Sequence, residues 1–156
     1  MPPDLTSLIF AWFEHAVPKP NQKNLHTQIG CHFEEVAEMI YTLKGKDRLT
    51  QSLLTQGLVA LYALADHLKS NGDCIELLNP AEFLDSLCDQ TVTATGVGYM
   101  MKADFIGALA DVNASNWSKF VHGRPVFDAN MKIQKGPNYF KANSAVFLPS
   151  EPVPVG

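Results

Sequence analysis

The chain has 156 residues, of which 46% are hydrophobic and 18% are charged. This is the composition of a globular protein and not of a disordered or fibrous one, and the length suits a single domain over residues 1–156. The formal net charge of −4 argues against binding to long nucleic acid, which favours a strongly positive surface.

The features that bear on location favour the cytoplasm and no membrane partner. The longest apolar stretch, "LLTQGLVALYALADHL", is interrupted by Gln56 and is too short to span a bilayer. The N-terminal "MPPDLTSLIFAWFEHA" has no basic region before its apolar run, so a docking helix is expected there in preference to a signal peptide. The three cysteines cannot all pair and form no Cys-x-x-Cys motif, so free thiols in a reducing cytosol are expected.

Helical periodicity dominates the chain and predicts about five helices. Pro18 and Pro20 end the first, because proline cannot continue a helix. Asn79, followed by proline, and Asp104 have the residue types of helix N-termini. The expected segments are about 4–15, 25–43, 49–70, 79–101 and 104–119.

Beyond about residue 121 the sequence is rich in Gly, Pro and Asn. This composition predicts an irregular C-terminal arm over about 121–156, with at most short strands. The predicted fold class is therefore all-α, a helical bundle with a C-terminal arm.

Two of the expected helices carry stripes of carboxylates. In "HFEEVAEMI", Glu34 and Glu38 lie one above the other, because a helical residue advances about 100°. Glu35 lies beside them. In "EFLDSLCDQ" the acids follow one another at i, i+3 and i+7 and share one side of the fourth helix: Glu82, Asp85 and Asp89.

A solvated helix face would explain either stripe alone. Solvated faces usually interleave Lys or Arg at i+4, however, and neither stripe contains a basic residue. A donor set of oxygens without nitrogen or sulfur suits a hard cation, Mg²⁺ or Mn²⁺. Because Mg²⁺ commonly keeps positions for water and phosphate oxygens, the stripes indicate phosphate chemistry.

The acidic motifs also resemble those of a known family. "EEVAE" matches Glu-Glu-x-x-Glu and "EFLD" matches Glu-x-x-Asp, a pair that resembles the signature of the all-α nucleoside triphosphate pyrophosphohydrolases. This MazG-like group includes phosphoribosyl-ATP pyrophosphohydrolase and dimeric dUTPase. "DSLCDQTVTATGVGYMM" looks like the family's Asp-x-x-x-Asp helix, and "VNASNWSKF" and "KGPNYF" resemble tail segments of one branch. The resemblance covers about residues 29–140.

The resemblance implies a Mg²⁺-dependent hydrolase, with Mn²⁺ as an alternative ion, that splits a nucleoside or deoxynucleoside triphosphate into monophosphate and pyrophosphate. Such an activity fits nucleotide-pool cleansing, control of dUTP or a stress response, and the sequence does not choose among them. The implied metal ligands are the six carboxylates of the two stripes, and Glu35 would also orient or deprotonate the attacking water. Asp85 completes Glu-x-x-Asp, whereas Asp89 stands where other members place their metal-binding aspartate, so both remain candidates. We favour Asp89 as the direct ligand.

A second group of candidates follows the fifth helix. Lys119, Arg124, Lys132, Lys135 and Lys141 lie in a span with one acid, Asp128. Ordinary surface lysines are the alternative, but a site for Mg²⁺-triphosphate needs cations for the phosphates that are not attacked. The resemblance singles out Lys119 and Lys135 as phosphate contacts, and Asn116 and Tyr139 for the sugar or base.

Three other features do not indicate a further site. Ser115 and Ser118 have no paired base in sequence, so nucleophilic catalysis has no support. The glycines of "TGVG" lack the Gly-Lys-Ser/Thr ending of a phosphate loop and are expected at helix contacts. Trp12 and Phe13 are expected in the core.

The partners follow from the same considerations. Family members form dimers or dimers of dimers, and the apolar stripes here exceed what a thin bundle could bury, so a homodimer or homotetramer is expected. Two functional alternatives remain: a phosphoribosyl-ATP-type pyrophosphohydrolase, and a non-catalytic helical binding module whose acids contact a basic partner.

Overall fold

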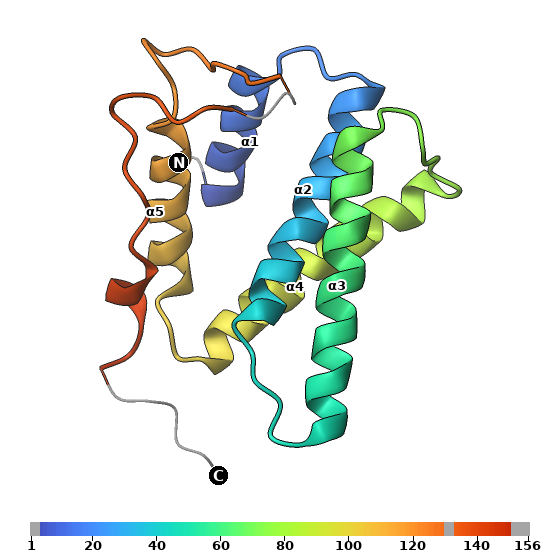
Figure 1. The fold of residues 1–156 in the computed structure, drawn as a ribbon. Coiled ribbons are helices and arrows are strands. Elements are labelled where there is room, and N and C mark those ends of the chain that lie inside the picture. Colours follow the sequence, from blue (N-terminus) through green and yellow to red (C-terminus); the bar gives the residue numbers. More distant parts are fainter. Residues whose placement is uncertain (1–3, 130–132, 151–156) are drawn as a thin grey trace. The chain divides into compact units, whose positions relative to one another are not determined.

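The protein is all-α, as the periodicity predicts. The structure, a computed structural model, describes residues 4–129 and 133–150. Its elements (Figure 1) are α1 Leu5–Ala16, α2 Gln22–Tyr41, α3 Arg48–Ser70, α4 Pro80–Met100, α5 Phe105–Trp117 and a 3₁₀ turn, η1, Ser144–Phe147. These described residues form no β-strand, only isolated bridges within the arm. Among them, no helix combines the length and apolar character needed to cross a bilayer.

Each α-helix begins after a side chain that accepts a hydrogen bond from its first turn. These N-caps are Asp4, Asn21, Asp47, Asn79 and Asp104. The helix boundaries fall within about two residues of the sequence expectation, with one exception. Helix α2 begins at Gln22 instead of about 25, because Asn21 and Asn24 cap each other's backbone N–H groups at 3.0 Å in a capping box.

The chain divides into two compact units. The hairpin unit is Lys19–Glu76 and contains α2 and α3. The main unit combines Met1–Pro18 with Leu77–Gly156, and it contains α1, α4, α5 and the C-terminal arm.

Small residues let the two helices of the hairpin unit approach closely. A Cβ added at Gly30 would lie 2.9 Å from both Ala65 O and Lys69 Cγ, so α2 touches the backbone of α3 at this point. Gly57 lies opposite Ile40, and the two pairings together make the helices antiparallel. Ala37, Ala65 and Leu68 are buried.

The core of the main unit forms where α1 meets the start of the arm. Trp12, Ala16 and Phe120 are buried together, and the Trp12 and Phe120 rings stack with their centroids 5.8 Å apart. The core role expected for Trp12 is confirmed. Phe13 packs edge-on against Trp12 at 4.9 Å and stays 38% exposed.

The two glycines of "TGVG" differ in their surroundings. A Cβ added at Gly98 would lie 2.5 Å from Phe105 Cδ2, so this glycine admits the α5 ring against α4. The expectation of a helix contact is confirmed there. It is wrong for Gly96, where an added Cβ would meet nothing within 4 Å among the described residues.

The two glycines therefore supply a matched pair of variants. Gly96→Ala should raise the free energy of unfolding by about 0.5–1 kcal/mol, because alanine favours the helix and the space is open. Gly98→Ala should lower it by about 1–3 kcal/mol, because the ring of Phe105 must move. Urea unfolding followed by circular dichroism measures both, and equal changes would contradict the packing described for Gly98.

Candidate functional site

The first acidic stripe includes one carboxylate that is paired with a cation. Lys69 Nζ on α3 lies 2.8 Å from Glu34 Oε1 and 3.2 Å from Asp66 Oδ1. The side chains of Lys69 and Glu34 are only 22% and 23% exposed. The stripe itself contains no basic residue, and the cation beside Glu34 comes from a different helix.

The environment of Lys69 keeps it charged. Burial lowers the pKa of its ammonium group, but hydrogen bonds to the Glu34 and Asp66 carboxylates outweigh the burial, and the net effect raises the pKa above its ordinary value. Lys69 therefore stays protonated throughout the neutral range.

The other two carboxylates of α2 are exposed. Ala37 marks the face of α2 that packs on α3, and Glu35 lies about 160° around the helix from it. Glu38 is about 100° from Ala37. Of the three acids, Glu34 lies at the edge of the contact between α2 and α3. Glu35 and Glu38 lie away from this contact, where a ligand can reach them.

The second stripe lies on the outer face of α4. Glu82, Asp85 and Asp89 are all exposed. Asp89 precedes Gly98 by nine residues, which places it about 180° around the helix from the contact with α5. The packing of α4 on α5 therefore leaves all three carboxylates accessible from the other side.

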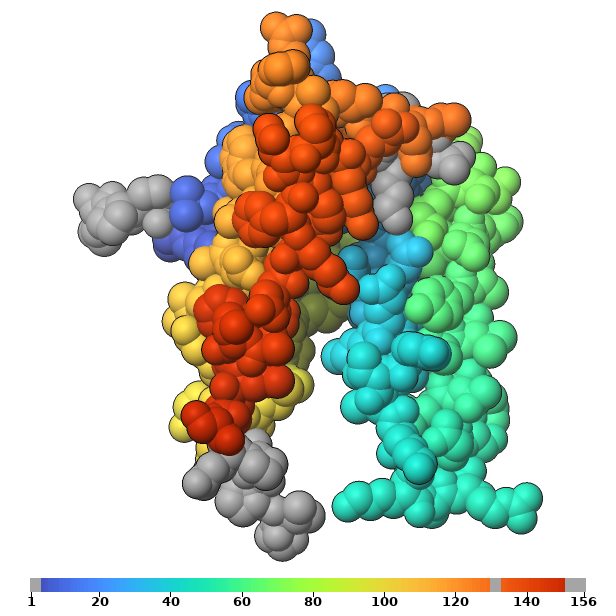
Figure 2. Space-filling view, turned by 60° about the vertical axis from the view of Figure 1, so that its left-hand side comes forward, coloured from blue at the N-terminus to red at the C-terminus, as the bar shows by residue number. Residues whose placement is uncertain are grey.

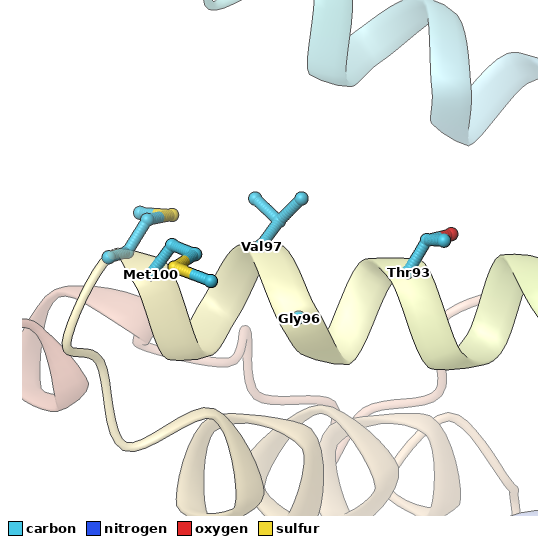
Figure 3. A pocket seen from close by; sticks show the side chains of 5 residues that line it. Thr93, Gly96, Val97 and Met100 are labelled. Carbon is cyan, nitrogen blue, oxygen red and sulfur yellow. The ribbon is translucent and has the colours of Figure 1, made fainter.

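An apolar surface continues this stripe toward the end of α4. Thr93, Gly96 and Met100 follow Asp89 at i+4, i+7 and i+11, and with Val97 and Met101 they line an open hollow of about 610 Å³. Figure 3 shows the side chains of Thr93, Val97 and Met100 on the side of α4 that faces away from α5. One face of α4 thus changes from acidic to apolar along its length.

The donor chemistry of the two stripes fits Mg²⁺ or Mn²⁺, since it consists of carboxylate oxygens alone. Among the residues that the structure describes, no three acidic, His or Cys side chains lie together as a ready metal site. Mg²⁺ commonly takes one or two protein carboxylates and completes its shell with water and phosphate oxygens, so such a group of three is not a requirement.

The C-terminal arm is held against α5 by serine hydroxyls. Ser115 Oγ donates to Phe140 O at 2.7 Å, and Phe140 N donates to Ser118 Oγ at 3.1 Å. Farther along, Asn143 N donates to Asp111 Oδ2 at 2.8 Å. The arm, orange to red in Figure 2, lies over α5. The irregular arm is thus confirmed over its described residues, and the two serines hold it in place.

This docking brings the four expected substrate residues together. Lys119 Nζ donates to Asn116 Oδ1 at 2.7 Å. Gly136 N donates to Lys119 O at 3.1 Å, so the segment of the arm with Lys135 lies beside the end of α5. Lys135 Nζ is 4.8 Å from the centroid of the Tyr139 ring.

The resulting group, which we call the basic corner, consists of Asn116, Lys119, Lys135 and Tyr139. Lys119 is half-buried and Lys135 is exposed. A Cβ added at Gly136 would lie 2.9 Å from Lys119 O, so glycine is needed for this close approach. Lys132, also expected in the basic span, lies outside the described residues.

Sequence reasoning missed the residues that act across the fold. The pairing of Lys69 with Glu34 joins positions 35 residues apart, and nothing in the local sequence marks it. Gly136 and the two serines carried a weak signal, since they belong to the tail segments that gave the family resemblance.

Comparison with known proteins yields no match, whether to a family model, to a curated protein or to a solved structure.

The serine contacts predict how the arm responds to mutation. Ser115→Ala should leave Phe140 O without its donor and cost about 1–3 kcal/mol, and amide exchange at 133–148 should accelerate. Thr95→Ala is the matched control, because the Thr95 hydroxyl donates to the Thr91 carbonyl of its own helix, at 2.8 Å. Hydrogen exchange followed by mass spectrometry checks both variants, and an unchanged arm in Ser115→Ala would contradict the docking role.

Proposed function

We propose that the protein is a Mg²⁺-dependent nucleoside triphosphate pyrophosphohydrolase of the MazG-like kind. The observation that carries the proposal is the basic corner. Four residues singled out from two separate sequence segments as substrate contacts lie together, joined by the hydrogen bond from Gly136 to Lys119. The exposed carboxylates on α2 and α4 add the acidic component that such a reaction needs.

The proposed metal ligands are the carboxylates of both stripes: Glu34, Glu35, Glu38, Glu82, Asp85 and Asp89. When bound, Mg²⁺ polarises phosphoryl oxygens and lowers the pKa of water. Glu34 would contribute through Oε2, because Lys69 contacts Oε1. Glu35 and Glu38 are the more accessible members of the α2 stripe.

The proposed reaction is a hydrolysis at the α–β anhydride. A water adds to phosphorus, the bridging P–O bond breaks, and pyrophosphate leaves. Glu35 orients this water and takes its proton, a role for which a carboxylate must be within hydrogen-bond reach of the water. The products are the nucleoside monophosphate and pyrophosphate.

The basic corner would hold the polyphosphate. Lys119 and Lys135 supply the positive charges that phosphate oxygens require. The Asn116 amide oxygen fixes the Lys119 ammonium by accepting a hydrogen bond from it at 2.7 Å, and the Tyr139 ring lies beside the Lys135 ammonium. Asn116 and Tyr139 would contact the sugar or base.

We also propose that the protein acts in the cytoplasm as a homodimer or homotetramer. Helix α4 supports the proposed oligomer, since Val92, Tyr99 and Met100 are 68%, 75% and 72% exposed. Contiguous exposed apolar surface of this kind commonly marks an interaction site.

Incubation with a panel of ribo- and deoxynucleoside triphosphates and Mg²⁺ tests the activity. We expect release of pyrophosphate and monophosphate from at least one of them, and a loss of about 100-fold or more in kcat for Glu38→Gln, which removes a charge from the metal site. Glu14→Gln, an exposed acid on α1, is the control and should leave kcat unchanged. Phosphoribosyl-ATP as the one active substrate would favour the alternative reaction. No release from any nucleotide would favour the binding module.

Replacement of the two aspartates of α4 should reduce activity to different extents. Asp89→Asn should abolish most activity, because a direct ligand gives its charge to the metal. Asp85→Asn should cost about 10–100-fold, as for a carboxylate that orients a ligand or water. Turnover at saturating Mg²⁺ decides between them. Near-normal turnover in Asp89→Asn together with a dead Asp85→Asn would assign the direct ligand to the Glu82-x-x-Asp85 motif instead.

A further inference from the structure

Lys69 pairs with Glu34 of the first acidic stripe but has no role in the proposed reaction. It reaches Glu34 because α2 has no side chain in its path. Gly30 lies one turn before Glu34, and its missing Cβ leaves the space in which the Lys69 stem runs, since an added Cβ would lie 2.9 Å from Lys69 Cγ. The contact is therefore built into the helix packing and is not a chance meeting of exposed side chains.

The geometry leaves chemical capacity on both partners. A carboxylate has two oxygens, and the contact at 2.8 Å uses Glu34 Oε1, so Oε2 can still bind a cation. A lysine ammonium has three N–H donors. Glu34 and Asp66 take two of them, which leaves one for a further acceptor.

The charge of Lys69 acts in opposite directions on two possible ligands. A bare divalent cation at Glu34 Oε2 would lie a few ångströms from a fixed ammonium and be repelled by it. A polyphosphate that carries its own divalent cation has a net negative charge. Its oxygens can accept a hydrogen bond from the remaining N–H of Lys69.

We propose that Lys69 is a specificity-determining residue that makes the α2 carboxylates bind a divalent cation together with polyphosphate in preference to the free cation. This inference rests on the proposed function, because it assumes that Glu34 is a metal ligand. It assigns to Lys69 a role that the family motifs do not include.

The test measures binding, without turnover, in the chain of 156 residues. Calorimetry with Mn²⁺ alone and with Mn²⁺ plus inorganic triphosphate compares the wild type with Lys69→Met. We expect Mn²⁺ alone to bind about 3- to 10-fold more tightly to the variant and Mn²⁺-triphosphate to bind about tenfold more weakly. Lys69→Arg, which keeps the charge, should restore the wild-type order. Asp66→Asn, which removes the 74% exposed partner, should change neither affinity by more than about twofold.

The outcomes separate the inference from the function. Shifts of both affinities in the same direction, or no shift, in Lys69→Met would overturn the role of Lys69 while leaving the metal site intact. Absence of Mn²⁺ binding to the wild type, with and without triphosphate, would overturn the proposed site itself and the inference with it. Lys69→Gln keeps a polar group beside Glu34 but removes the charge. It should show the same two shifts as Lys69→Met, tighter Mn²⁺ and weaker Mn²⁺-triphosphate. It replaces Lys69→Met if circular dichroism shows Lys69→Met to be unfolded.

Discussion

The close approach of helices at small residues is the constraint on which the functional surfaces depend. Gly30 lets α2 lie on the backbone of α3, and Gly98 admits the Phe105 ring against α4. Each contact determines which side of its helix is buried. The opposite side of that helix then remains exposed. The carboxylates of α4 and the outer carboxylates of α2 are exposed for this reason.

The same principle explains why Glu34 differs from its neighbours. It lies one turn from Gly30, at the edge of the buried face, where a side chain from α3 can reach it. Desolvation makes an unpaired charge costly at such a place, and Lys69 offsets that cost with an ion pair at 2.8 Å. Glu35 and Glu38 are exposed to solvent, where the cost of desolvation does not arise. Three acids that are similar in sequence thus have two different environments.

In the main unit, an irregular segment and not a second helix brings functional side chains together. The arm has little regular structure to satisfy its backbone groups, so α5 supplies donors and acceptors through Ser115, Ser118 and Asp111. These bonds align the arm along the helix, and the backbone hydrogen bond from Gly136 N to Lys119 O brings the segment with Lys135 beside the end of α5. A basic corner arises in a chain of net charge −4 because docking concentrates cations locally.

The amino-acid sequence by itself determined the helices, their N-termini and the acidic stripes. These features depend on contacts between residues three or four apart, such as Asp104 with the N–H of Gly107 at 2.9 Å, and on the angular period of the helix. The start of α2 was predicted three residues late. Pro18 and Pro20 indicate a loop in the sequence, whereas the capping box of Asn21 and Asn24 begins the helix directly after them. Only the tertiary structure decided that Lys69 meets Glu34, that Gly98 is packed while Gly96 is open, and that the arm lies on α5. Those contacts join residues that are distant in the chain or differ only in what surrounds them, and helix packing, not local preference, selects them.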